Sequence, residues 1–310
     1  MGLLFRDRVS TYPNRYKLNK ADGTSEYVTL ERADSPTQVG TPLNADTFNA
    51  MQRGHTPHNL LDNSDFRNPV NQRGQASYSG GVYGIDRWFG DNADSVLTTT
   101  ENGIIATGAY LVQILERKHV GKVLTICVRD AKGGIAVATC TVQQATGYSW
   151  LCTDVSTTGT FVGILQTDTG VLRANVKNSG GVAIEWVALY EGEYTAETLP
   201  EYQPKGYAHE LAECLRYYRQ FDRECIGTGY TTGTGEYAIM CLPFTMRIQN
   251  PTVIGSGVYC RVNGNDYACD SLQIQNLDNM LHLVLHAPGA PAKYAAAFYA
   301  NNLFALSAEL

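Results

Sequence analysis

Short runs of apolar and β-branched residues, separated by turn residues, dominate the chain between residues 59 and 199. Eight such runs lie between Gly, Asn and Asp turns: VLTTT, GIIATG, YLVQILER, KVLTICVRD, IAVATCTVQ, FVGILQT, VLRANVK and VAIEWVALYEG. In the fourth run Leu124, Ile126 and Val128 fall on one face, which is the period of a strand. This spacing, without a long helix, predicts a β-sandwich of jelly-roll topology over residues 57–200.

A second unit is predicted after the proline-rich joint at residues 199–206, because neither helix nor sheet continues easily through proline. Apolar residues then recur at steps of four, three, four and three: Tyr207, Leu211, Cys214, Tyr218 and Phe221. This heptad pattern predicts a helix that either forms a short trimeric coiled-coil seam or packs on its own domain, since two heptads are fewer than a coiled coil usually has. Strand patterns resume after it, so residues 201–310 predict a helix and a small β head.

The first 56 residues are polar and broken by turns. Tyr12, Pro13 and Pro36 lie in turn sequences. Leu43 and Phe48 have the spacing of a hydrophobic staple and predict a helix of about two and a half turns. Such a short helix is marginal alone in water, so it must dock on something. We expect the segment to attach the chain to a partner; packing on a neighbouring domain is the alternative.

Composition narrows the function classes. Charged residues make up 17% of the chain and the net charge is −6, without a Lys or Arg cluster that could follow nucleic-acid phosphates. No apolar run approaches the ~18 residues of a membrane span. Charged residues interrupt the early apolar positions, as a signal peptide would not allow, so folding in a cytosol is expected.

The eight cysteines are expected to be free thiols, because the chain shows neither an export signal nor a CxxC pair. Close pairs of zinc ligands are also lacking, so no metal and no cofactor are expected. His282 and His286 share one face of the strand pattern MLHLVLH but lie ~13 Å apart, too far to hold one ion. They are expected to face outward, or to form rings with their symmetry mates if the chain is a trimer.

Several stretches carry a resemblance to one family. RDRVSTYPNRYKL with ERADSPTQVGTPLN is similar to the N-terminal segment of tail-fibre and baseplate-associated structural proteins in phages of Gram-positive gut bacteria. NLLDNSDFRNPVNQRGQ with IDRWFG resembles the opening of the jelly-roll, carbohydrate-binding-like module of such proteins, and ALYEGEYTAETLPEYQPKGYAHELAECLRYYRQF resembles its exit and the following helix. LPFTMRIQNPTV and LSAEL match the distal part.

The resemblance implies a component of the virion tail or baseplate that folds in the host cytoplasm. It further implies a homotrimer that binds other virion proteins through residues 1–54 and attaches to a host cell-surface polysaccharide, without inserting into a membrane. The motifs identify a structural family well and a ligand poorly.

Aromatic residues in polar loops are the candidates for sugar binding, because an aromatic ring stacks on the apolar face of a pyranose. The candidates in the sandwich are Tyr78, Tyr83, Tyr148 and Trp150. A second set in the head comprises Tyr230, Tyr237, Tyr259 and Tyr267. Packing in the core is the alternative for each, and it is the expectation for Trp88, Phe89 and Trp186.

No catalytic motif appears: the GxSxG elbow, the Walker loop, HExxH and the Rossmann glycines are all missing from the sequence. A glycosidase needs two carboxylates ~5 to 9.5 Å apart. The acids Asp86, Asp91, Asp94, Asp154 and Asp168 lie in loops or at strand ends, so catalysis is not expected. Three classes remain: a receptor-binding tail component, a purely structural tail or baseplate protein, and a glycan-degrading tail enzyme.

Overall fold

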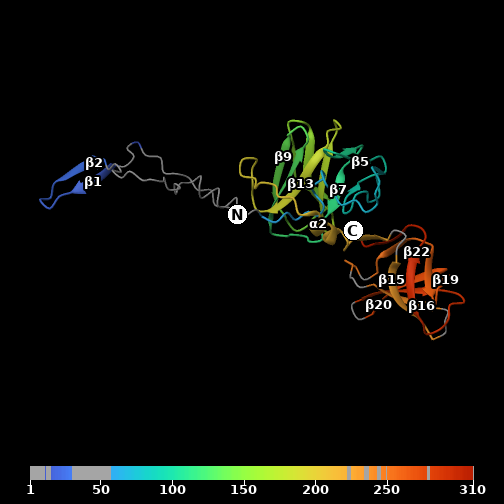
Figure 1. The fold of residues 1–310 in the computed structure, drawn as a ribbon. Helices are drawn as coiled ribbons and strands as arrows, with labels where there is room; N and C mark the ends of the chain where they lie inside the picture. Colours follow the sequence, from blue (N-terminus) through green and yellow to red (C-terminus); the bar gives the residue numbers. More distant parts are fainter. Residues whose placement is uncertain are drawn as a thin grey trace. The chain divides into compact units, whose positions relative to one another are not determined.

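The computed structural model describes residues 11, 15–29, 57–221, 225–233, 237–242, 246–248, 250–277 and 280–309. The fold is mainly β, with 49% strand in several antiparallel sheets and, among the described residues, one short helix (Figure 1). The β class expected from the sequence is therefore confirmed. The chain divides into two compact units, Met1–Pro57 and His58–Leu310.

The described part of unit 1 is a hairpin. Strands β1 (Arg15–Asn19) and β2 (Ser25–Thr29) pair antiparallel, and Gly23 supplies the positive φ of +82° that the turn requires. Lys20 and Glu26 form an exposed ion pair of 3.1 Å across it. The candidate attachment residues Tyr12, Pro13, Pro36, Leu43 and Phe48 lie outside the described residues.

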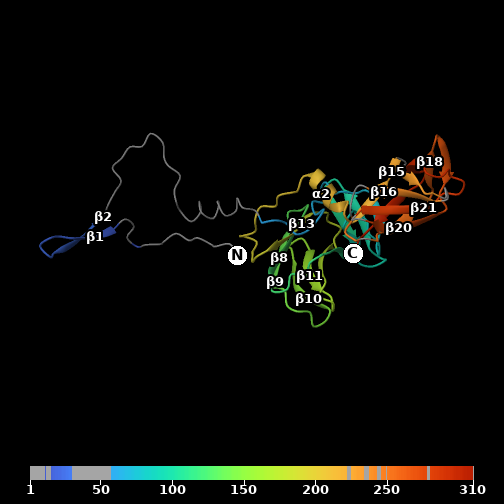
Figure 2. The same cartoon turned by 90° about the horizontal axis from the view of Figure 1, so that it is seen from below.

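Two antiparallel sheets form the first part of unit 2. The six-stranded sheet has the order β3 (Ser77–Ser79), β5 (Val96–Thr100), β6 (Gly103–Thr107), β13 (Ile184–Glu191), β8 (Val123–Asp130), β9 (Ile135–Thr141). The five-stranded sheet has the order β10 (Ser149–Val155), β11 (Thr160–Gln166), β12 (Leu172–Asn178), β7 (Leu111–Ile114), β4 (Phe89–Gly90). The edge strands β9 and β10 lie side by side (Figure 2).

Both sheets contribute alternate residues to one apolar core. Ile126 and Val128 of β8 enter it from one sheet and Val162 and Ile164 of β11 from the other. Trp88 is fully buried in this core and packs edge-on against Phe66, with 5.1 Å between ring centroids. Trp186 is also buried, stacked on Tyr202 at 4.5 Å. The core positions predicted for the two tryptophans are confirmed.

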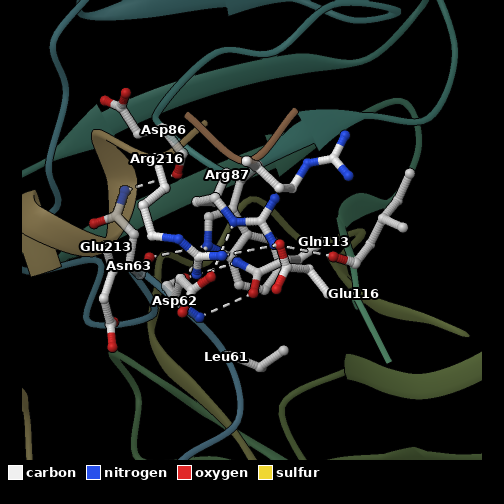
Figure 3. A network of polar contacts seen from close by, with 12 residues as sticks. Leu61, Asp62, Asn63, Asp86, Arg87, Gln113, Glu116, Glu213 and Arg216 are labelled. Carbon is white, nitrogen blue, oxygen red and sulfur yellow. Dashed lines mark hydrogen bonds and ion pairs between the residues drawn. The ribbon is translucent and has the colours of Figure 1, made fainter. Parts of the chain in front are cut away.

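Helix α2 (Tyr207–Cys214) is tied to the sheets by a buried polar network (Figure 3). The Arg87 Nε donates to Asp62 Oδ2 at 3.0 Å, and the guanidinium lies 3.5 Å from the ring centroid of Tyr217. Asp62 also exchanges two backbone hydrogen bonds with the Gln113 side chain, at 2.7 and 2.9 Å. From the helix, Glu210 accepts the Asn63 N–H at 2.6 Å.

The heptad pattern does not correspond to a two-heptad helix. The helix ends at Cys214, and Tyr218 and Phe221 belong to strand β14 (Tyr218–Phe221). Cys214 and Tyr218 are buried inside unit 2, while Tyr207 is exposed and Leu211 is half-buried. This corrects the predicted helical seam: the helix packs on its own unit, as the alternative expected.

The rest of unit 2 contains two further antiparallel sheets. A three-stranded sheet has the order β14, β23 (Phe304–Ser307), β17 (Thr252–Gly255). A seven-stranded sheet has the order β19 (Asn265–Ala268), β18 (Val258–Val262), β22 (Ala295–Ala300), β15 (Cys225–Thr231), β16 (Tyr237–Leu242), β21 (Met280–His286), β20 (Ser271–Leu277). Only Cys269 and Asp270 join its two edge strands, so the sheet curls back on itself around a second apolar core.

A buried charge cluster joins the two-sheet part to the end of the chain. Arg73 pairs with Glu309 at 2.6 Å and lies 3.8 Å from Asp86 and 3.7 Å from the ring centroid of Tyr218. Two buried carboxylates thus share one guanidinium. Burial raises the pKa of Glu309 from 4.5 to about 7 although Arg73 opposes the shift, and it raises the pKa of Asp86 in the same way.

We expect unit 2 to lose stability as the pH rises through this cluster. Because the folded pKa of Glu309 lies above the unfolded one, its contribution is complete below pH 4.5 and lost as the pH rises through about 7. The loss should reach about 3 kcal/mol, because each tenfold change in proton affinity corresponds to ~1.4 kcal/mol. Urea unfolding across this range measures it. Glu309→Gln, which cannot ionise, should flatten the profile; an unchanged profile would contradict the assignment.

Candidate functional site

The four sugar-binding candidates of the two-sheet part occupy different environments. Tyr78 is only 6% exposed, and its hydroxyl donates to Asn71 and accepts the Gln75 N–H, so its prediction as an exposed platform is wrong. Tyr83 is half-buried with its ring centroid 5.0 Å from that of Phe89. Tyr148 and Trp150 are exposed, Trp150 by 41%. Two of the four therefore lie on the surface.

Trp150 belongs to an aromatic cluster on the outer side of the five-stranded sheet. Its ring centroid lies 5.3 Å from that of Phe161 and 5.6 Å from that of Tyr110, and these two are 5.2 Å apart. Phe161 faces outward because its neighbour Val162 enters the core from the same strand. We call this cluster, with the polar residues beside it on the same sheet side, the aromatic face.

The backbone holds the Trp150 ring against the sheet. The register of β10 shifts between Trp150 and Cys152, so a bulge re-aims the indole relative to a regular strand. On the next strand, a Cβ atom at Gly163 would lie 3.0 Å from the Trp150 ring and 2.8 Å from the Cys152 carbonyl oxygen. The glycine therefore leaves the room in which the indole lies over β11.

Polar side chains border the aromatic face. Lys177 is opposite Phe161 in the register of β11 and β12, and its Nζ lies 5.1 Å from the ring centroid of Tyr110. Arg173 and Asn175 alternate with it along β12, outside the core residues Ala174 and Val176. The Asn175 Nδ2 donates to the Arg173 carbonyl oxygen at 2.9 Å. Asn175 itself is buried, so the face presents three rings and two cations.

Sequence reasoning missed Tyr110, Phe161 and Lys177. Phe161 stands in the apolar run FVGILQT, where either face could be the core, and Tyr110 follows a glycine turn far from Trp150 in sequence. Only the strand register brings them together. The one usable signal was Gly163 within this run, because a glycine inside a strand often marks a place where another group packs closely on the backbone.

The candidates of the second set lie on different faces of the seven-stranded sheet. Tyr230 and Tyr237 are exposed on the outer side, and the half-buried Tyr259 stacks there on Tyr299 at 5.5 Å. Tyr267 pairs with the buried Cys260 and is half-buried against the core, the packing that was the alternative to ligand binding.

The two histidines share one side of β21, opposite the buried Leu283 and Leu285. The expectation that both face outward is wrong for His282, because its two ring nitrogens are shielded from solvent and have no hydrogen-bond partner among the described residues. The His286 Nδ1 lies 2.6 Å from an Asp270 oxygen. Over the described ranges no group of three or more His, Cys, Asp or Glu side chains could hold a metal ion. The six cysteines whose side chains are described are free thiols: Cys127, Cys140, Cys152, Cys214, Cys260 and Cys269.

A surface groove of about 490 Å³ beside β9 and β10 carries three carboxylates, those of Asp154, Glu193 and Glu197. Asp154 accepts the Val137 N–H at 2.7 Å. The Thr195 hydroxyl donates to Glu197 at 2.7 Å and lowers the pKa of that carboxyl. A glycosidase general acid requires the opposite shift. Glu197 therefore lacks the raised pKa of such an acid.

No family model, no curated protein and no solved structure matches the chain. Within the described residues no helix is long and apolar enough to span a membrane.

Proposed function

We propose that the chain is a non-enzymatic component of a phage tail fibre, or a receptor-binding protein of the baseplate, that attaches to a host cell-surface glycan. Its two-sheet part would be a jelly-roll module of the carbohydrate-binding type. The observation that carries the proposal is the aromatic face, where Trp150 stays 41% exposed beside Phe161 and Tyr110. The family resemblance supports the virion assignment.

The geometry suits a sugar because aromatic rings pack on the apolar C–H faces of pyranoses, while amide and charged groups bind hydroxyls. An exposed indole held in place by a bulge and a glycine loses little conformational freedom on binding. A glycan array probed with the full chain tests the proposal. We expect binding that Trp150→Ala abolishes or weakens; an array without any bound glycan contradicts it.

We further propose that residues 1–54 attach the chain to other virion proteins and that the chain is a homotrimer, as the resemblance implies. Unit 2 is compact by itself, so deleting residues 1–54 should leave a folded protein that no longer incorporates into particles. Circular dichroism and particle incorporation measure the two effects. Unfolding of the truncated protein would mean that the segment belongs to a core. Light scattering that reports a monomer would contradict the trimer.

A purely structural role is the second candidate, and the seven-stranded sheet favours it. None of its seven strands contains Lys or Glu, and Tyr230, Tyr237 and Tyr259 lie on its outer side. Surfaces that pack on other proteins are rich in Tyr and poor in Lys and Glu. If this is the whole function, the array stays empty, and Tyr230→Glu with Tyr237→Glu blocks assembly instead of cell binding.

A further inference from the structure

The charged residues of the aromatic face indicate which kind of glycan it binds, an inference that rests on the proposed function. We propose that the glycan bound there is anionic, carrying uronate carboxylates or phosphodiester groups that Lys177 and Arg173 recognise. Both cations lie on the outer side of β12, beside β11 and β10, which carry Phe161 and Trp150. Within the described part of the chain neither forms an ion pair with a carboxylate.

The net charge of the chain is −6. Other cations of the two-sheet part do pair with acids, such as Lys122 with Glu191 at 2.6 Å and Arg129 with Glu185 at 3.2 Å. A negatively charged chain repels an anionic polymer at long range, so recognition requires a local positive surface. Lys177 and Arg173 supply one where the aromatic rings lie.

The chain leaves hydrogen-bonding capacity unused at Arg173. The Arg173 Nε is shielded from solvent and has no hydrogen-bond partner among the described residues. Such orphaned donors are rare and costly, and an ordered water or a bound oxygen commonly satisfies them. The two terminal nitrogens of the guanidinium can donate two parallel N–H bonds to a carboxylate or phosphate.

Lys177 also borders a small pocket of about 240 Å³. Thr107, Gly108, Asn178 and Ser179 contribute to its walls. Lys177 is one of the residues that line it, so a charged substituent bound there would lie beside this side chain. Along β12 the Cα atoms of Arg173 and Lys177 are ~13 Å apart, at ~3.3 Å for each residue of strand. The two cations therefore match charges that recur along a polymer instead of one charged sugar.

The experiment compares acidic and neutral glycans on one array probed with the full chain. The array holds uronate glycans, phosphodiester-linked glycans and their uncharged counterparts. We expect the bound glycans to be acidic, and Lys177→Gln and Arg173→Gln each to weaken binding by about tenfold, the loss of one charged hydrogen bond. Lys132→Gln, which removes a charge from the turn between β8 and β9, is the matched control and should bind like the unaltered chain.

The outcomes separate the two proposals. Binding to uncharged glycans as strong as to acidic ones, or full binding by Lys177→Gln, overturns the anionic ligand and leaves the glycan-binding function. An array with no bound glycan overturns both. Whether uronates or phosphodiesters bind identifies the source of the charge. If Arg173→Gln melts early, the salt dependence of binding by the unaltered chain tests the anionic ligand instead. This binding should weaken at least about tenfold between ~0.05 and ~0.5 M NaCl. Salt-independent binding contradicts the inference.

Discussion

Trp150→Ala should bind the glycan at least tenfold more weakly than the unaltered chain while it stays folded. Truncating a stacking aromatic costs about 1 to 3 kcal/mol, by analogy with bases on aromatic platforms, and ~1.4 kcal/mol is tenfold in affinity. Because the Trp150 side chain is 41% exposed and contacts Phe161 and Tyr110 at the surface, its loss should change the free energy of unfolding little. Calorimetric titration and thermal melting measure the two effects.

Trp88→Ala is the matched control, since it removes the same side chain from the core. Trp88 is fully buried, and such a truncation costs about 3 to 5 kcal/mol. If Trp150→Ala melts as early as Trp88→Ala and binding fades only with unfolding, Trp150 is a core residue. If instead Trp150→Ala is stable and binds as before, the site lies elsewhere, and Tyr230, Tyr237 and Tyr259 are the next residues to test.

Asp62→Ala should cost about 3 to 5 kcal/mol of stability, because it leaves the buried Arg87 guanidinium without its counter-charge. Arg87 is 2% exposed, its Nε bonds to Asp62 at 3.0 Å, and the Lys205 Nζ lies 3.7 Å from the same carboxylate. Since the network holds α2 against the sheets, hydrogen exchange in the helix should accelerate as well. Urea unfolding and hydrogen exchange measure both effects.

Lys122→Ala is the control for this prediction. It breaks the Lys122–Glu191 pair, which has a similar length of 2.6 Å but is about half exposed on both sides. Exposed pairs contribute little to stability, because solvent screens them. If Asp62→Ala and Lys122→Ala lose the same free energy of unfolding, burial of the Arg87 network adds nothing to stability.

The sequence predicted the strands and the core more completely than the site. Strand alternation placed Leu124, Ile126 and Val128 in the core because one face of that run must be buried. The failure at Tyr78 has a physical cause: the surrounding glycines permit close packing instead of a wet loop. A Cβ atom at Gly84 would lie 2.9 Å from the Tyr78 ring, and one at Gly80 would overlap the Asn92 carbonyl oxygen. Glycines in a loop sequence alone could not distinguish a tightly packed loop from a solvated one.

The aromatic face was beyond prediction for a different reason. Trp150 and Phe161 are brought together by a bulge in β10 and by the pairing of β10 with β11, neither of which a single sequence specifies. The heptad pattern failed likewise, since Cys214 ends the helix and Tyr218 enters a strand that pairs with residues near the end of the chain. A spacing of a few apolar residues does not distinguish a helical seam from a helix followed by a strand.

The most direct test of glycan binding by the aromatic face is the fluorescence of Trp150 during titration with a glycan that the array identifies. Of the three tryptophans, Trp88 and Trp186 are buried, so a change in indole exposure reports on Trp150. We predict a saturable blue shift and protection from acrylamide quenching, both lost in Trp150→Phe. Calorimetric binding of the same glycan with unchanged Trp150 emission and quenching would contradict the account.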